Sequence, residues 1–233
     1  MAERPDWQWD EMQQVGTDYA DVAEVQRYDE RMSQFRDLAA EDGAILADLA
    51  LAPGSTVLEI GTGTGHFAHH ALAAGHRVIA ADVSQVMLDY AAAKAQRLGL
   101  TGLTCLHAGF LELELPAESL DGAVSVAALH HLPDTWKLVA LRRLHDALRP
   151  GARFVLRDVV FSVVEHDYAT GMQALINEIP DTMRVEAVRH VAQEYSTYDW
   201  LMEALLERAG FTISAQQRHR GSLVHYLCLR DGG

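Results

Sequence analysis

The chain has 233 residues, of which 49% are apolar and 22% charged, and a formal net charge of -14 at pH 7. This length is enough for one sizeable domain, and no apolar run approaches the ~20 residues that span a bilayer. The acidic balance argues against binding to nucleic acid, which needs clustered Lys and Arg. The first residues lack a basic stretch followed by an apolar run, so we expect no secretion signal and a cytoplasmic protein.

From about residue 54, short apolar runs alternate with helical patterns, which indicates a parallel sheet with crossover helices. Glycine or proline ends or follows each helical pattern. The strands are predicted at Thr56–Ile60, Arg77–Ala81, Leu103–His107, Asp121–Val126 and Arg153–Val159, and the helices at Gly65–Ala74, Ser84–Leu98 and Asp134–Leu148.

The tail predicts one more helix and then two adjacent strands. Ser196 is expected to cap a helix that Gly210 ends, and "FTISAQQ" and "SLVHYLCLR" are expected to form an antiparallel hairpin. Residues 1–30 and 161–195 lie outside the alternating pattern, and we expect them to cover the carboxyl edge of the sheet. The chain is thus predicted to be a single domain over residues 1–233 with two cap segments.

The stretch "VLEIGTGTGHF" joins the first strand to a helix through three glycines. Gly61, Gly63 and Gly65 follow a G-x-G-x-G pattern, whereas dinucleotide sites use G-x-G-x-x-G, whose third glycine would fall at His66. Glu59 enters the turn as a carboxylate, which is poorly placed beside a diphosphate but suited to a cationic ligand. S-adenosylmethionine carries an ammonium and a sulfonium group and no phosphate.

Two further positions fit an adenosine group. Asp82 ends the second strand about 20 residues beyond the turn, where an acid can accept hydrogen bonds from both ribose hydroxyls, in NAD enzymes as well as adenosyl enzymes. Phe110 follows the third strand and can lie against an adenine face.

Four segments in this order and spacing resemble the Rossmann-type (class I) S-adenosylmethionine-dependent methyltransferases. They are "VLEIGTGTGHFAHHAL", "VIAADVSQVMLDYAAAKA", "LDGAVSVAALHHLPD" and "LRRLHDALRPGARFVLRD", and the similarity covers about residues 54–160. The resemblance implies an α/β, Rossmann-like doubly wound sheet of seven strands in the order 3-2-1-4-5-7-6, with strand 7 antiparallel. It also implies S-adenosyl-L-methionine as the cofactor.

The resemblance also implies which residues bind this cofactor. The turn glycines would admit its methionine and ribose parts, and Glu59 would hold the turn or reach the amino group through water. Gly109 departs from the family, which often has an acidic residue there to accept the adenine amino group. An N-terminal helix often covers the methionine end in related enzymes, which points to Tyr19 and Tyr28. The expected cofactor-binding residues are Tyr19, Tyr28, Glu59, Gly61, Thr62, Gly63, Gly65, Asp82, Val83, Met87, Gly109, Phe110 and Ala127.

Histidines follow the fourth strand, at the edge where the methyl group would be presented. His131 is the candidate base that accepts a proton from the acceptor, although an acceptor held in line with the sulfonium needs no base. His130, His166 and Tyr195 are candidate acceptor-binding residues. No metal is expected, because the histidines of the first helix have no acid or cysteine at metal spacing.

The sequence favours a methyltransferase that acts on O or N of a small-molecule acceptor, with carbon acceptors also open. The pattern of methyltransferases that act on adenine or glutamine amides is absent after the fourth strand, where the chain reads "SVAALHHLPD". Two alternatives stay open at this stage. One is an NAD(P)-dependent oxidoreductase, which Glu59 and His66 oppose, and the other is a non-catalytic module that binds an adenosyl ligand.

Overall fold

A computed structural model describes residues 5–13, 25, 37–162, 167–179, 181–219 and 222–231 of the chain. The strands are β1 (Thr56–Ile60), β2 (Arg77–Asp82), β3 (Leu103–His107), β4 (Leu120–Val126), β5 (Leu148–Phe161), β6 (Thr197–Tyr198), β7 (Phe211–His219) and β8 (Leu223–Arg230). The helices are α2 (Leu38–Leu49), α3 (His66–Ala73), α4 (Gln85–Arg97), α5 (Asp134–Ala147), α6 (Tyr168–Glu178), α7 (Arg184–Gln193) and α8 (Asp199–Ala209), with short 3-10 helices η1 (Leu129–His131) and η2 (Asp181–Met183).

The strands form one sheet in the order β3-β2-β1-β4-β5-β8-β7. Neighbouring strands from β3 to β5 are parallel, whereas β8 runs antiparallel to both β5 and β7. The two-residue strand β6 pairs with the end of β5 and lies off this path. Apart from β6, this is the predicted order, with the hairpin strand that follows the last turn inserted between β5 and β7.

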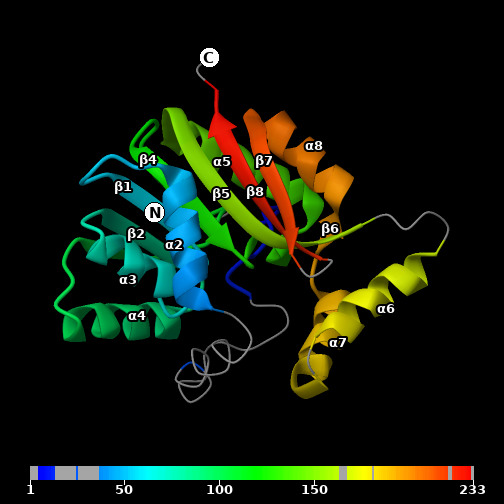
Figure 1. Cartoon of the computed structure of the whole chain (residues 1–233). Coiled ribbons are helices and arrows are strands. Elements are labelled where there is room, and N and C mark those ends of the chain that lie inside the picture. Colours follow the sequence, from blue (N-terminus) through cyan, green and yellow to red (C-terminus); the bar gives the residue numbers. More distant parts are fainter. Residues whose placement is uncertain are drawn as a thin grey trace.

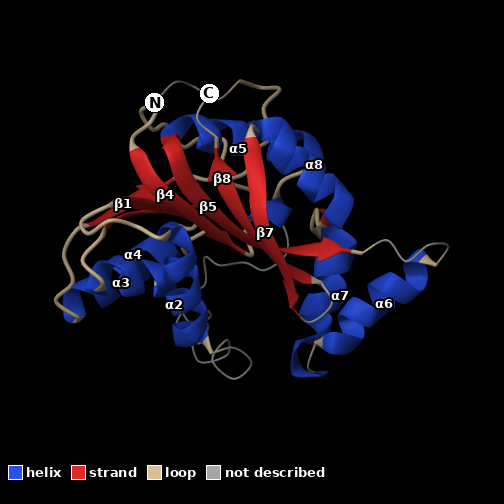
Figure 2. Cartoon of the chain, turned by 45° about the horizontal axis from the view of Figure 1, so that its top comes forward, coloured by secondary structure: helices blue, strands red, loops and turns tan. Residues whose placement is uncertain are grey.

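Helices cover both faces of the sheet (Figures 1 and 2). The helices α2, α3 and α4 lie on one face and α5 and α8 on the other, and each face has its own apolar core. Successive strand residues supply opposite cores, as Val57 and Leu58 do, because side chains alternate across a strand. Both neighbours are fully buried, as expected for a strand covered on both sides.

The segment between β5 and α8 departs from the alternating pattern. The helices α6 and α7 project beyond the end of β5, beside β6 (Figure 1). The prediction that Ser196 caps the next helix is wrong, because α8 begins at Asp199 and the Ser196 hydroxyl lies 2.7 Å from Nε2 of His190. The pairing of β6 with β5 keeps residues 197–198 extended, which delays the start of the helix.

The strand β5 begins earlier than the predicted Arg153. Leu148 already pairs with Leu120, and a shift in register follows before the regular ladder resumes at Gly122 and Arg153. In the described ranges, no helix combines the length and apolar character that crossing a bilayer requires.

Candidate active site

The turn from β1 to α3 lies at the carboxyl edge of the sheet. Two of its three glycines are packed against protein, and the third faces open space. A Cβ at Gly61 would lie 2.3 Å from Cβ of Ala128, and one at Gly65 would lie 2.8 Å from Cβ of Ala91, so both glycines allow close packing of protein on protein. A Cβ at Gly63 would meet no protein atom within 4 Å. Gly63 has a φ of +53°, and it lines an open pocket.

Glu59 lies beneath this turn and is 5% exposed. Its carboxyl accepts hydrogen bonds from Oγ1 of Thr62 at 2.6 Å and from the backbone N–H of Ala68 at 3.1 Å. Burial raises the pKa of Glu59 to about 8, so the carboxyl is neutral at pH 7. Glu59 therefore holds the turn and start of α3 in place, and it presents no charge to the pocket.

Asp82 ends β2 and connects the turn to the start of α4. Its carboxylate accepts hydrogen bonds from the backbone N–H groups of Gly63 and Ser84, each at 2.8 Å. Burial raises the pKa of Asp82, and these two N–H donors oppose that rise. Asp82 also lines the pocket, where its carboxylate can accept hydrogen bonds from a ligand.

A residue from the N-terminal segment completes the opposite wall. The Glu11 carboxyl accepts hydrogen bonds from the backbone N–H groups of Leu111 at 2.6 Å and Glu112 at 2.8 Å. It occupies the space beside Gly109, where a Cβ would lie 2.4 Å from the Glu11 carboxyl carbon. Burial raises the pKa of Glu11 to about 7. The Glu11 carboxyl thus fills the space that a side chain of residue 109 would occupy.

The pocket holds about 910 Å³ of empty space, a volume that includes open solvent at its mouth. Its walls come from the turn, the ends of β1, β2 and β4, the loops after β3 and β4, and the N-terminal segment. The lining residues are Trp9, Glu11, Gln13, Ile60, Gly61, Gly63, Asp82, Val83, Met87, Gly109, Phe110, Val126, Ala127, Ala128, His131 and Leu132.

The two histidines of η1 have opposite environments. His131 lines the pocket, whereas His130 is buried behind it with Nδ1 2.5 Å from the Asp158 carboxylate. Burial lowers the pKa of His130, but the Asp158 and Glu194 carboxylates outweigh this effect and raise it to about 9. Burial and the neighbouring His130 charge lower the pKa of His131 to about 4. At pH 7, His131 is therefore a neutral imidazole and a weak base.

Several predicted site residues do not line this pocket. Glu59, Thr62 and Gly65 support the turn from below, and His130 lies in the buried cluster. Tyr195 packs edge-on against Trp9, with ring centroids 5.5 Å apart, and so reaches the pocket only through that ring. The predictions for Tyr19, Tyr28 and His166 concern residues outside the described ranges.

The pocket also contains residues that were not predicted from the sequence, namely Trp9, Glu11, Gln13, Ile60, Val126, Ala128 and Leu132. Ile60, Val126 and Ala128 lie at or next to the ends of β1 and β4, so their positions could have been inferred from the parallel sheet, and Leu132 directly follows the predicted His131. Trp9, Glu11 and Gln13 belong to a segment that has no motif, and nothing in the sequence indicates its approach to residues 109–112.

The chain is similar to known methyltransferases. A family model described as a methyltransferase domain matches residues 57–151. An uncharacterized methyltransferase of Geobacillus kaustophilus is 30% identical over 203 residues, which cover 84% of this chain and 85% of the relative. Another from Anoxybacillus flavithermus is 29% identical over 212 residues, covering 88% and 95%.

Solved structures share the fold. A SAM-dependent methyltransferase from Aquifex aeolicus superposes with a TM-score of 0.63 at 21% identity, covering 90% of this chain and 98% of that chain. The 1,6-didemethyltoxoflavin-N1-methyltransferase of Burkholderia thailandensis, solved with S-adenosylhomocysteine, gives 0.61 at 24% identity and covers 94% of each chain. The chain belongs to the class I S-adenosylmethionine-dependent methyltransferases.

Proposed function

We propose that this methyltransferase transfers the methyl group of S-adenosylmethionine to an oxygen or nitrogen of a small-molecule acceptor. The observation that carries the proposal is the composition of the pocket. Its described lining is mainly apolar and glycine, with Asp82, Glu11 and His131 as the ionisable groups and no Lys or Arg. Such a lining suits an uncharged or cationic metabolite, and it offers no partner for the phosphates of a nucleic acid.

The residues of the pocket fit the adenosyl cofactor. The open space before Gly63 leaves room for a ligand against the backbone, and the Asp82 carboxylate lines the same pocket as an acceptor for ribose hydroxyls. Val83, Met87 and Phe110 offer apolar surfaces for the adenine ring. The cofactor would supply a methyl group bound to a sulfonium sulfur. Transfer of the methyl group leaves S-adenosylhomocysteine as the second product.

We assign to Glu11 the role that the family resemblance implies for an acidic side chain after β3. Glu11 reaches the loop beside Gly109 and Phe110 from the N-terminal segment, where its carboxyl can accept a hydrogen bond from the adenine amino group. The adenine part of the site is therefore assembled from two distant segments of the chain.

His131 is the group nearest to the acceptor in this proposal. As a neutral imidazole that lines the pocket, it accepts a hydrogen bond from the acceptor's O–H or N–H and aligns the attacking lone pair with the methyl group. The acceptor's proton is released to solvent water during or after the transfer. Among the structural neighbours are an N-methyltransferase of 1,6-didemethyltoxoflavin and a C-methyltransferase of geranyl diphosphate. The described lining of the pocket has no Lys or Arg that could bind a diphosphate, which favours the first kind of acceptor here.

The cap segments complete the acceptor side. Trp9 lines the pocket and is held by Tyr195, which follows α7, so the N-terminal segment and the segment after β5 meet at this wall. We assign both to one methyltransferase domain, with the cap excluding water from the reacting sulfonium.

The test is a metabolite screen that detects S-adenosylhomocysteine, followed by turnover and cofactor affinity for His131→Ala and His131→Asn. We expect His131→Ala to lower kcat by about 10- to 100-fold with cofactor affinity unchanged, and Asn to restore part of it as a hydrogen-bond acceptor. Cofactor binding without turnover across a broad panel supports the non-catalytic module instead. Tighter binding of NAD than of S-adenosylmethionine contradicts the proposal altogether.

A further inference from the structure

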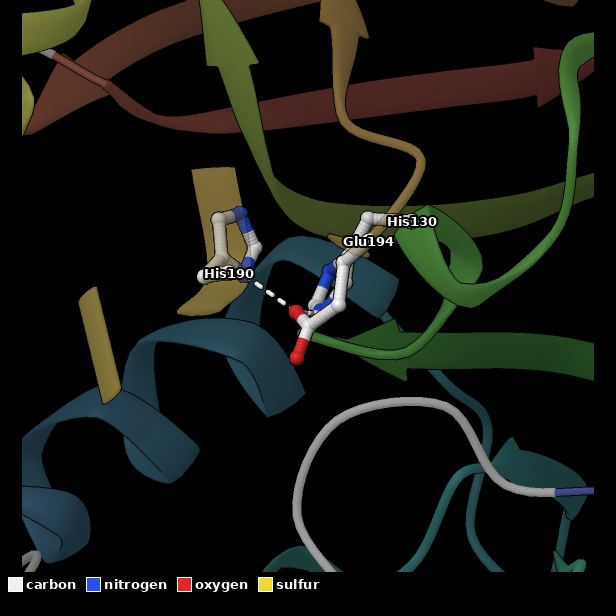
Figure 3. A group of neighbouring side chains, drawn as sticks. All are labelled: His130, His190 and Glu194. Carbon is white, nitrogen blue, oxygen red and sulfur yellow. Dashed lines mark ion pairs between the residues drawn. The ribbon is translucent and has the colours of Figure 1, made fainter. Parts of the chain in front are cut away.

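A second group of ionisable side chains lies behind the pocket. His130 of η1, His190 of α7 and Glu194 just after α7 bring one nitrogen or oxygen atom each within 4.8 Å of one another (Figure 3). The His130, His190 and Glu194 side chains are 6%, 15% and 9% exposed. None of the three lines the pocket, so the proposed methyl transfer leaves them without a role.

Each imidazole is oriented by a partner on its other nitrogen. Asp158 holds Nδ1 of His130, which leaves Nε2 3.3 Å from Oε2 of Glu194. Ser196 lies 2.7 Å from Nε2 of His190, which leaves Nδ1 facing the same Glu194 oxygen. Metal-bound histidines commonly have such a partner, because a carboxylate or hydroxyl on one nitrogen fixes the tautomer that presents the other.

The charges of the cluster also favour a divalent cation. Asp158 is fully buried and Glu194 nearly so. The nearest buried ammonium, on Lys137, is bonded to Asp134 and to the backbone carbonyl of Tyr195. A divalent ion bound by two neutral imidazoles takes the place of the proton on His130 and balances the charges of the Asp158 and Glu194 carboxylates.

We propose that His130, His190 and Glu194 bind one divalent transition-metal ion of the zinc type, with Asp158 and Ser196 orienting the two imidazoles. Two imidazoles and one carboxylate suit Zn²⁺ or Co²⁺ better than Mg²⁺ or Ca²⁺, which prefer oxygen ligands. A water molecule completes the coordination. The ion joins α7 to η1 and so fastens the cap to the edge of the sheet. This site does not depend on the identity of the methyl acceptor.

The experiment measures metal binding directly on the full chain after treatment with a chelator. Calorimetry with Zn²⁺ is expected to show one equivalent bound, Mg²⁺ is expected not to compete, and Co²⁺ is expected to give the visible absorption of a site with nitrogen ligands. His190→Ala and Glu194→Gln each weaken Zn²⁺ binding at least about tenfold, and Ser196→Ala weakens it about 10-fold or more. The control is His70→Ala, which removes a partly exposed histidine of α3 and leaves Zn²⁺ binding unchanged.

Two results overturn the proposal. One is the absence of stoichiometric Zn²⁺ binding in the parent chain. The other is an unchanged affinity in Glu194→Gln, a variant that keeps the side-chain shape and serves if His190→Ala fails to fold. Circular dichroism and S-adenosylmethionine affinity establish that each variant is folded. Because the readout is the metal itself, failure here leaves the proposed methyl transfer untouched, and failure of that proposal leaves the metal site untouched.

Discussion

At the scale of single residues, Gly109 is required by a partner almost a hundred positions earlier in the chain. In Gly109→Ala, the new methyl group displaces the Glu11 carboxyl, which breaks the hydrogen bonds to Leu111 and Glu112. We expect S-adenosylmethionine affinity to fall by about 1–3 kcal/mol, the usual cost of unpaired buried groups. Calorimetry measures the affinity, and hydrogen exchange measures the release of the Leu111 and Glu112 amides.

The matched control for this change is Gly43→Ala. Gly43 lies inside α2, and a Cβ there meets nothing within 4 Å. Alanine is expected to stabilise the helix by about 0.5–1 kcal/mol and to leave cofactor affinity unchanged. Equal affinities in both alanine variants would contradict the role assigned to Glu11.

Glu59 makes stability depend on pH. Its pKa is about 8 in the folded chain against 4.5 for an exposed glutamate carboxyl. The native state therefore keeps a proton that the unfolded chain releases, and Glu59 makes the free energy of unfolding fall as pH rises from about 4.5 to about 8, by at most about 1.4 kcal/mol per pH unit. Glu59→Gln keeps the acceptor oxygen for Thr62 and Ala68 and removes the titration.

Urea unfolding at pH 5.5 and pH 8 tests this prediction. The stability of the Gln variant relative to the parent is expected to increase from pH 5.5 to pH 8, and a constant difference would refute the prediction.

The positions of Gly61, Gly63 and Asp82 in the pocket were predictable because the turn motif fixes their place at a strand end. The buried environment of Glu59 was not, because a motif gives spacing and says nothing of the helix packed beneath it.

At the scale of elements, the N-terminal segment and the segment after α7 support one wall through Trp9 and Tyr195. We expect the effects of removing the two rings on the free energy of cofactor binding to be non-additive by about 0.5–1.5 kcal/mol, the usual coupling energy of an aromatic pair. A double-mutant cycle with Trp9→Leu and Tyr195→Leu measures this coupling. Tyr195→Phe keeps the ring and serves as the control with parent-like affinity. Additive effects of the two leucine substitutions would show that the segments act independently.

The elements between β1 and β5, and the terminal hairpin, follow from the sequence because their apolar periodicity and glycine stops agree with the fold. The pieces α6, η2, α7 and β6 do not follow in the same way. Ser196 illustrates the reason: a serine before a helical pattern predicts an N-cap, yet its hydroxyl contacts His190, and the extended pairing of residues 197–198 displaces the helix start. Contacts between distant segments outweighed the local signal.

At the scale of the whole molecule, the pocket lies between strands and loops that belong to both halves of the sheet. Ligand that binds only the folded state stabilises it by about 2.7 kcal/mol at 100 times its Kd. For a chain of this size we expect S-adenosylmethionine or S-adenosylhomocysteine at that excess to raise Tm by roughly 5–10 °C. NAD at the same concentration is the control, with Tm unchanged. A larger shift with NAD would contradict the assignment of the pocket.

The place of β8 between β5 and β7 has a consequence for synthesis in the cell. Residues 223–229 pair with Arg153–Val159 of β5, so this edge of β5 stays unpaired until the late segment has left the ribosome. The nascent chain can assemble β1 to β5 and their helices earlier, but it carries an unpaired strand edge while β7 and β8 are being translated. Ribosome-bound chains that stop before residue 223 are thus the species that a chaperone must protect from aggregation.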